Sequence, residues 1–518
     1  MGAAIPQRET ADVNAYTVLS RRLAGTPDPL GVYALVDDEC CALFETADAG
    51  AGEQAESLIF LDACVSLTAH GDAVRMQAHT APGEQIADRV AGQMPAAHTQ
   101  RDPDNRETRF RFASPAIGKS EALRLKAASV LDPLRALTAG SGLGEVAEGA
   151  QNFVFGCFAY DLIAAFESVP ISARQAGDFP DYSFHLAGSV IRVDHRHART
   201  EILVLAPKSD TIEARRRLTA LTRLCEQAEP YRPRAAKPVP ARLAQSDKDY
   251  AEVVARCKRH IRAGDVYQIV PSRAWDAPCD DPLAAYARLR KANPSPYMFY
   301  LNDPAGTLFG ASPESALKVD AASRRVGIRP IAGTRPRGED ADSDSRLELE
   351  LRLSQKEVAE HVMLVDLARN DVARVSAPGT RRVTELMRVE RYSCVMHLVS
   401  RVEGSLAPGL DALHAYRATL NMGTLTGAPK LKAAELLAGI EPARRGPYGG
   451  AVGYLTATGD LDTAIVIRSA LVQNGVARVQ AGAGVVADSE PLAEAAETRR
   501  KARAVLEALG VEEERGDE

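Results

Sequence analysis

Apolar stretches of strand length and amphipathic stretches of helical length follow one another along most of the chain. The apolar runs predict β-strands at residues 31–36, 42–46, 57–62, 152–160, 186–193, 201–206, 266–270, 297–301, 307–310, 391–402, 464–473 and 476–486. Apolar positions at helical spacing predict helices at residues 210–225, 250–261, 282–291, 354–375, 428–440 and 489–509. Strands scattered among helices in this way indicate an α/β or α+β protein and not a doubly wound parallel sheet.

Turn and capping residues divide this pattern. Asn474-Gly475, between two apolar runs, predicts a tight β-hairpin, and Ser246 followed by Asp249 resembles a helix capping box. Ser489 is a candidate cap for the last helix. The proline-rich stretch near residues 231–245 resists both helix and strand ladder, so we expect a linker there.

Composition excludes several classes of protein. The 518 residues are 45% hydrophobic and 25% charged, and the net charge of -6 without a long basic run argues against nucleic-acid binding. Eight cysteines form no CxxC pair and no cluster with histidine, which favours reduced thiols over a disulfide frame or a zinc site. No apolar run approaches the ~18 residues of a membrane helix, and the first residues lack a signal pattern. We therefore expect a cytoplasmic protein.

One turn, residues 329–338, combines arginines with prolines and glycines. Small residues let a ligand approach the backbone, and arginines bind carboxylates through two parallel hydrogen bonds. A solvated loop explains the same composition.

Two acidic groups lie on predicted helices. Glu357, Glu360 and His361 share one helix face, and Glu494 and Glu497 belong to the last helix. One glutamate from each helix would make an oxygen-only pair that suits Mg²⁺, although solvated acidic faces are more common.

Two polar side chains interrupt apolar strands. Arg468 is costly inside an apolar run unless it meets a carboxylate from the protein or a ligand. His397 is either a core histidine or a general base. Gly482 and Gly484 allow either close packing or backbone contact with an anion. The sequence contains no Gly-x-Ser-x-Gly elbow, which argues against a hydrolase with a serine nucleophile.

Several ordered segments together resemble the chorismate-utilising enzymes, most of all the members that make anthranilate. They are residues 268–273 (QIVPSR), 293–298 (NPSPYM), 312–315 (SPES), 330–336 (PIAGTRP), 360–371 (EHVMLVDLARND), 427–430 (GAPK), 448–450 (YGG), 467–469 (IRS), 480–484 (QAGAG) and 497–499 (ETR). The resemblance implies two large, mostly antiparallel β-sheets packed as a sandwich with helices outside. It also implies a regulatory region in residues 1–230, intertwined with a catalytic domain in residues 246–518.

The implied reaction adds ammonia to chorismate, giving 2-amino-2-deoxyisochorismate, which then loses pyruvate to give anthranilate. By resemblance, Glu360 and Glu497 hold Mg²⁺, with Glu357 supporting them. The implied substrate contacts are Gly333, Thr334, Tyr448, Arg468, Gly482, Ala483 and Gly484. The implied catalytic residues are Glu314 as the acid for the departing 4-hydroxyl, His397 for the ring proton, Gln268 and Thr334.

Two positions discriminate within the family. Relatives that add water commonly have a lysine base in place of Gln268, and a neutral amide fits ammonia better. Aminodeoxychorismate synthases commonly have a nucleophilic lysine at Ala332, so alanine favours anthranilate. A synthase that stops at aminodeoxyisochorismate, or an inactive tryptophan-binding regulator, remains an alternative.

The resemblance also implies partners and regulation. We expect ammonia from a separate glutamine amidotransferase subunit, because no cysteine has a glutaminase-like setting. Glu45 and Thr46, with Pro296, Tyr297 and Met298, match the family's tryptophan feedback site. Phe44 and Thr46 depart from the family's Leu-Leu-Glu-Ser segment, which affects the expected affinity.

Overall fold

Two long strands, β3 (Gln54–His70) and β8 (Tyr182–Asp194), run side by side through both sheets of the protein. A bulge between Ala63 and Val65 bends the pair, so each strand contributes one half to each sheet. The structure is a computed structural model, and it describes residues 15–36, 38–47, 54–102, 104–113, 120–139, 152–172, 177–391 and 395–512.

All strand pairs within the two sheets are antiparallel. The first sheet runs in the order β1 (Tyr16–Ala24), β9 (Arg199–Pro207), β8, β3, β2 (Cys41–Ala47), β13 (Tyr297–Asp303), β14 (Gly306–Ser312), β23 (Ser469–Gln473), β24 (Val476–Gly482), β12 (Ser272–Pro278), β10 (Arg242–Leu243). The second runs β5 (Thr99–Asp102), β6 (Glu107–Arg111), β4 (Ala73–Ala78), β3, β8, β7 (Phe153–Phe158), β21 (Ala451–Thr456), β22 (Leu461–Ile465), β15 (Ser315–Asp320), β16 (Arg325–Ile328), β19 (Val395–Ser405). Strands β17 (Ile331–Pro336) and β18 (Arg382–Arg391) also pair with β19, and β11 (Gln268–Ile269) pairs with β20 (Gly427–Ala428).

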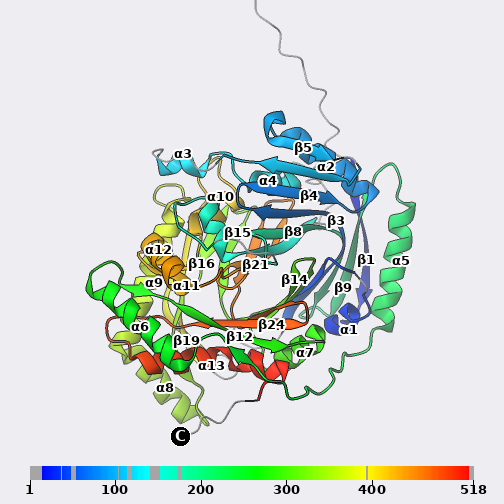
Figure 1. Cartoon of the computed structure of the whole chain (residues 1–518). Helices are drawn as coiled ribbons and strands as arrows, with labels where there is room; N and C mark the ends of the chain where they lie inside the picture. Colours follow the sequence, from blue (N-terminus) through cyan, green and yellow to red (C-terminus); the bar gives the residue numbers. More distant parts are fainter. Residues whose placement is uncertain are drawn as a thin grey trace, which may run out of the picture.

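Helices cover the outer faces of the sheets (Figure 1). They are α1 (Pro29–Tyr33), α2 (Ala81–Gln93), α3 (Glu121–Leu125), α4 (Asp132–Ala139), α5 (Ile212–Gln227), α6 (Asp247–Arg262), α7 (Pro282–Ala292), α8 (Ala341–Leu353), α9 (Gln355–Ala373), α10 (Ala412–Thr419), α11 (Gly423–Thr426), α12 (Lys430–Ile440) and α13 (Pro491–Leu509), with 3₁₀ turns η1 (Ala96–His98) and η2 (Tyr160–Ala165). Within the described ranges, no helix combines the length and the apolar content that a membrane crossing needs.

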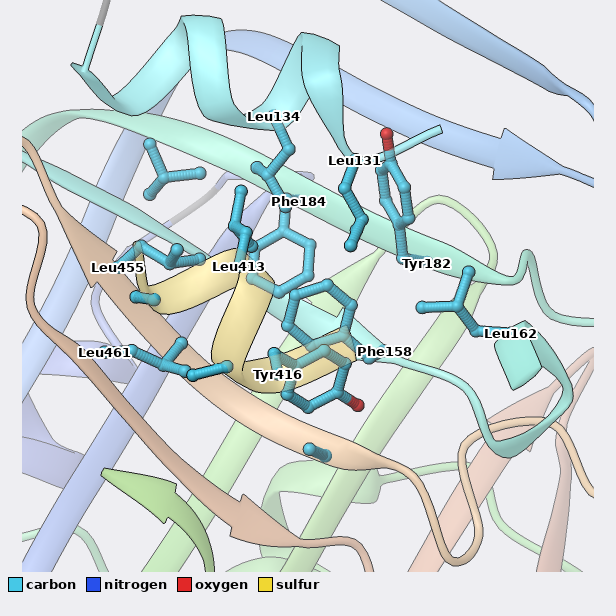
Figure 2. Close-up of a cluster of buried hydrophobic side chains, with 14 of the residues drawn as sticks. Leu131, Leu134, Phe158, Leu162, Tyr182, Phe184, Leu413, Tyr416, Leu455 and Leu461 are labelled. Carbon is cyan, nitrogen blue, oxygen red and sulfur yellow. The ribbon is translucent and has the colours of Figure 1, made fainter. Parts of the chain in front are cut away.

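The alternation of side chains along each strand produces a buried layer on both faces. Between the sheets lies an aromatic cluster in which Phe60 stacks on Phe155 at a centroid distance of 5.0 Å. Outside the second sheet, Phe158 stacks on Tyr416 of α10 at 4.0 Å, among the leucines of Figure 2. A third cluster joins α5, α7 and α13 to the first sheet.

The expected fold class is confirmed: helices surround a large antiparallel sheet structure. Strands from the first and last parts of the chain alternate, since β2 pairs with β13 and β7 pairs with β21. This pairing agrees with intertwined regions, while the functional division near residue 230 stays a prediction.

Three local expectations are wrong. The apolar run at residues 31–36 forms no strand: its first half ends helix α1, which Asp28 caps and Pro29 begins, and a turn follows. The run at 464–473 is two strands, β22 and β23, with a break at residues 466–468. Ser489 does not cap the last helix, since its hydroxyl accepts the Val486 N–H instead. Part of the run at 391–402, residues 392–394, and the tail after residue 512 lie outside the described residues.

Candidate active site

Glu314 lies on the tight connection between β14 and β15 and is 8% exposed. The Ser312 hydroxyl accepts the Glu314 N–H at 3.3 Å, and the Ile465 N–H donates to the Glu314 carbonyl at 3.0 Å. The hydroxyl of Thr424 in α11 donates to Oε1 at 3.1 Å. Burial raises the pKa of this carboxyl to about 8, against the opposing effects of Thr424, Lys501 and Arg468. At neutral pH the group is therefore a carboxylic acid with a proton to give.

Arg468 lies in the break between β22 and β23. Its φ of 50° is a left-handed conformation that ends one strand and redirects the next. Burial lowers the pKa of the guanidinium, while Tyr448, Glu497 and Glu314 raise it. Among the described residues, none forms a hydrogen bond or ion pair with its side chain, so the cation is available to an anionic ligand.

The arginines of residues 329–338 have a different role. Arg329 pairs with Glu390 at 2.6 Å, Arg335 with Glu357 at 3.1 Å and Arg337 with Asp344 at 2.8 Å. These pairs hold β17 to β18, α9 and α8. The three arginines of this turn therefore pair with carboxylates of the protein itself.

Gly333 and Thr334 of β17 lie beside His397 of β19. The His397 Nδ1 is 3.0 Å from the Thr334 hydroxyl and 3.2 Å from the Gly333 carbonyl. Because a carbonyl can only accept, Nδ1 carries the proton and the lone pair lies on Nε2. Burial lowers the pKa of His397 to about 4, so the ring is neutral at pH 7. A Cβ at Gly333 would lie 3.2 Å from Glu357 Oε2, so glycine allows α9 to approach closely.

Helices α9 and α13 bring their acidic residues together. Burial raises the pKa of Glu360, and the negative charges of Glu357, Glu494 and Glu497 add to the rise, while Lys356 opposes it. Like charges held close together disfavour the ionised form, and a bound cation would relieve that repulsion. Still, within the described ranges no three acidic, histidine or cysteine side chains are arranged as a complete metal site.

Gln268 of β11 is buried beside residues 482–484. Its Oε1 is a buried acceptor without a hydrogen-bond donor among the described residues. A Cβ at Gly484 would lie 2.7 Å from Gln268 Nε2, so glycine lets the Gln268 amide lie against this segment. The Ala483 N–H already donates to the Pro271 carbonyl at 3.3 Å, which limits its use as a substrate contact. Tyr448 is buried nearby, and its hydroxyl lies 3.1 Å from the position of a Cβ on Gly482.

Two residues of this site were missed by sequence reasoning. Lys501 Nζ lies 2.7 Å from Glu497 Oε1 and 3.0 Å from the Gly482 carbonyl. The spacing of one helical turn between Glu497 and Lys501 is the available signal, and that spacing is typical of an exposed ion pair. Thr424 gave no signal, because nothing in a four-residue turn indicates which distant carboxyl it meets.

The segments expected to bind tryptophan are adjacent strands. In the β2–β13 ladder Thr46 faces Tyr297 and Glu45 faces Met298, and the Ala47 N–H donates to the Pro296 carbonyl at 3.0 Å. A cavity of about 30 Å³ lies at this junction, too small for an amino acid unless side chains move.

Sequence comparison identifies the family to which the chain belongs. Residues 76–507 match the family model described as chorismate binding enzyme, and the chain belongs to that family. The chain is 49% identical over 490 residues to the anthranilate synthase component 1 of Escherichia coli (strain K12), covering 91% of this chain and 92% of that protein. It is 45% identical over 525 residues to the component 1 of Vibrio cholerae, covering 98% of both.

Solved structures of chorismate-utilising enzymes have a similar fold. The anthranilate synthase component I from Streptococcus pneumoniae TIGR4 has a TM-score of 0.68 and 28% identity, covering 87% of this chain and 92% of that one. The menaquinone-specific isochorismate synthase from Escherichia coli shares the fold, with a TM-score of 0.68 at 18% identity over 97% of this chain and 96% of that one.

Proposed function

We propose that this chain converts chorismate and ammonia into anthranilate and pyruvate through 2-amino-2-deoxyisochorismate. The observation that carries the proposal is the protonated, buried Glu314 in the same site as the unpaired Arg468. A substrate with two carboxylates and a poor leaving group needs a fixed cation and an acid of this kind.

Each residue then has a definite task. Arg468 and Tyr448 hold a carboxylate, with Gly333, Thr334 and residues 482–484 along the substrate's edges. Glu314 gives its proton to the departing 4-hydroxyl, and a pKa of about 8 keeps that proton in place until then. His397 takes the ring proton on Nε2 during loss of pyruvate. The unpaired Gln268 Oε1 accepts an N–H of the attacking ammonia.

A magnesium ion fits the carboxylates of α9 and α13. Glu360 and Glu497 offer oxygen ligands only, and Mg²⁺ commonly binds one or two carboxylates plus water and substrate oxygens. When bound, the ion would neutralise the substrate carboxylate and polarise it. Glu360→Gln or Glu497→Gln is expected to abolish Mg²⁺ binding measured by calorimetry.

The ammonia source and the regulation belong to the same proposal. The relatives are called component 1, which implies a second component, and we assign to that component the role of glutamine amidotransferase. Tryptophan is the proposed inhibitor at the β2–β13 junction, and the cytoplasm is the proposed location.

Ala332 argues against aminodeoxychorismate synthase, since β17 offers no amine to attack the ring. An inactive regulator is disfavoured because Glu314, Glu360, Arg468 and Glu497 are all present. The test is the isolated chain with chorismate, Mg²⁺ and an ammonium salt, followed by anthranilate fluorescence. Folded protein that yields no anthranilate would overturn the proposal, and an accumulating aminodeoxyisochorismate would support the synthase that stops early.

A further inference from the structure

A small cavity adjoins Glu314 on the side of α9 and α11. Its volume is about 30 Å³. Its polar lining is Glu314, Ser315, Asp371 and Thr424, and the rest is mainly apolar side chains of α9 and the neighbouring loops. About 10–15 Å³ suffices for one water, provided that two to four polar groups surround it. The cavity meets both conditions.

Surrounding contacts give the cavity a fixed shape. Lys430 Nζ pairs with Asp371 at 2.6 Å and donates to the Thr419 carbonyl at 3.0 Å, all of it buried. This pair joins α9 to α12, and Asp371 also lines the cavity together with Thr424. A Cβ on Gly423 would lie 1.8 Å from Leu367, so the turn packs tightly against α9. The polar wall is therefore held in place from both helices.

The proposed reaction produces a water molecule next to this cavity. As the ammonia nitrogen bonds to C2 and the double bonds shift, the C4–O bond breaks and the Glu314 proton passes to the departing oxygen. The oxygen leaves as water, and Glu314 is left as a buried carboxylate. The added nitrogen releases one proton to solvent, and Glu314 must regain one before the next turnover, so the protons balance.

We propose that this cavity is a water site that receives the departing hydroxyl as water and returns a proton to Glu314 through the Thr424 hydroxyl. In the proposed reaction the substrate occupies the side of Glu314 that faces Arg468, which leaves the cavity side as the route for water. Thr424 acts here as a positioning residue: its hydroxyl holds Oε1 at 3.1 Å and lines the cavity at the same time. This inference rests on the role proposed for Glu314.

Filling the cavity provides the first test. Ala368 is buried in the cavity wall, and Ala368→Met would occupy the space of the water. The matched control is Ala373→Met, on the exposed side of the same helix. Ala368→Met is expected to slow the conversion of chorismate to anthranilate by roughly tenfold, the effect of about one lost hydrogen bond, and the control variant is expected to keep the wild-type rate. Loss of pyruvate from supplied aminodeoxyisochorismate needs neither the acid nor the leaving water, and its rate is expected to stay unchanged.

Thr424 provides the second test, which stands if Ala368→Met fails to fold. Thr424→Val keeps the shape and removes the hydroxyl, whereas Thr424→Ser keeps the hydroxyl. We expect Thr424→Val to slow the first half-reaction by up to tenfold and to increase its solvent deuterium isotope effect, with Thr424→Ser near wild type. Equal slowing of both half-reactions, or no slowing in either variant, would overturn the water site. Wild-type protein that makes no anthranilate would instead overturn the proposed function itself.

Discussion

Glu314 and Glu45 are both buried carboxyl groups, and strands β13 and β14 lie between them in the first sheet. Glu45 is 1% exposed and accepts hydrogen bonds from Gln54 at 2.7 Å, from Tyr286 at 2.7 Å, and from Arg290 at 2.9 and 2.7 Å. Glu314 is 8% exposed and accepts one, from Thr424.

This difference in hydrogen bonding separates structure from chemistry. A carboxylate with four donors is held by charge-assisted hydrogen bonds, which join β2 to α7. A buried carboxyl with one donor keeps its proton, at a cost in stability that only a reaction or ligand explains. The Arg468 side chain and Gln268 Oε1 have no hydrogen-bond partner among the described residues. Like Glu314, they are therefore candidates for contact with a ligand.

The largest expected effect comes from removing the acid. Glu314→Gln retains an acceptor for Thr424 and loses the transferable proton, so kcat for anthranilate formation is expected to fall roughly 10²–10⁴-fold. Anthranilate fluorescence measures the loss, and release of pyruvate from aminodeoxyisochorismate serves as control. A variant with more than a tenth of wild-type kcat would show that Glu314 is not the acid.

Next in size is the loss of the Glu45 charge. Glu45→Gln leaves the half-buried Arg290 guanidinium with only the longer contact to Asp28 at 3.4 Å and is expected to cost about 3 kcal/mol of unfolding free energy. Urea unfolding measures it, and Glu435→Gln, in an exposed pair with Lys432, is the matched control with almost no loss. In the absence of tryptophan, kcat is expected to stay at the wild-type value. A large fall in kcat with unchanged stability would reverse the roles of the two carboxylates.

Arg468 supplies the third prediction. Arg468→Met removes the unpaired cation and is expected to raise the KM for chorismate roughly 10–100-fold, the range for one or two charge-assisted hydrogen bonds. Stability is expected to hold or rise, because no protein partner is lost. Arg478→Met on the exposed part of β24, where Arg478 pairs with Asp276, is the control for KM. An unchanged KM in Arg468→Met would remove Arg468 from the substrate site.

Much of this arrangement could be predicted from the sequence, for local reasons. The Asn474-Gly475 hairpin is confirmed with φ values of 50° and 75°, and the Ser246–Asp249 capping box begins α6. Periodicity located α7, α9 and α12 within a few residues. The acidic face of α9 followed from its spacing, and the ordered segments resembling the family identified the residues that now lie around Glu314.

What the sequence could not indicate depends on contacts between distant segments. The burial that raises the pKa of Glu314 comes from the surrounding elements, including α11 and β22. The break at Arg468 needs a left-handed non-glycine residue, which no pattern of apolar positions predicts. The hydrogen bonds that Glu45 accepts come in part from Tyr286 and Arg290, which are more than two hundred residues away in the sequence.

The raised pKa of Glu314 predicts how the stability of the folded protein depends on pH. Its pKa in the folded protein, about 8, lies above the ordinary value of 4.5, so the folded state binds the proton more tightly. Stability from this group is complete below pH 4.5 and is lost as the pH rises through 8, by up to about 5 kcal/mol. Glu314→Gln does not titrate, so its stability relative to wild type is expected to increase between pH 5 and 9. Parallel pH profiles of the two proteins would mean that Glu314 is not protonated in the native state.

The smallest expected effect comes from removing one of the four hydrogen-bond donors to Glu45. Tyr286→Phe removes one of its donors, and Arg290 and Gln54 continue to stabilise the charge, so the cost is expected to be about 1 kcal/mol. Tyr267→Phe, at a hydroxyl on an exposed ring, is the control with no measurable change. Urea midpoints at constant slope give the difference. A loss comparable to that of Glu45→Gln would mean that the network is cooperative and that Glu45, like Glu314, depends on a single neighbour.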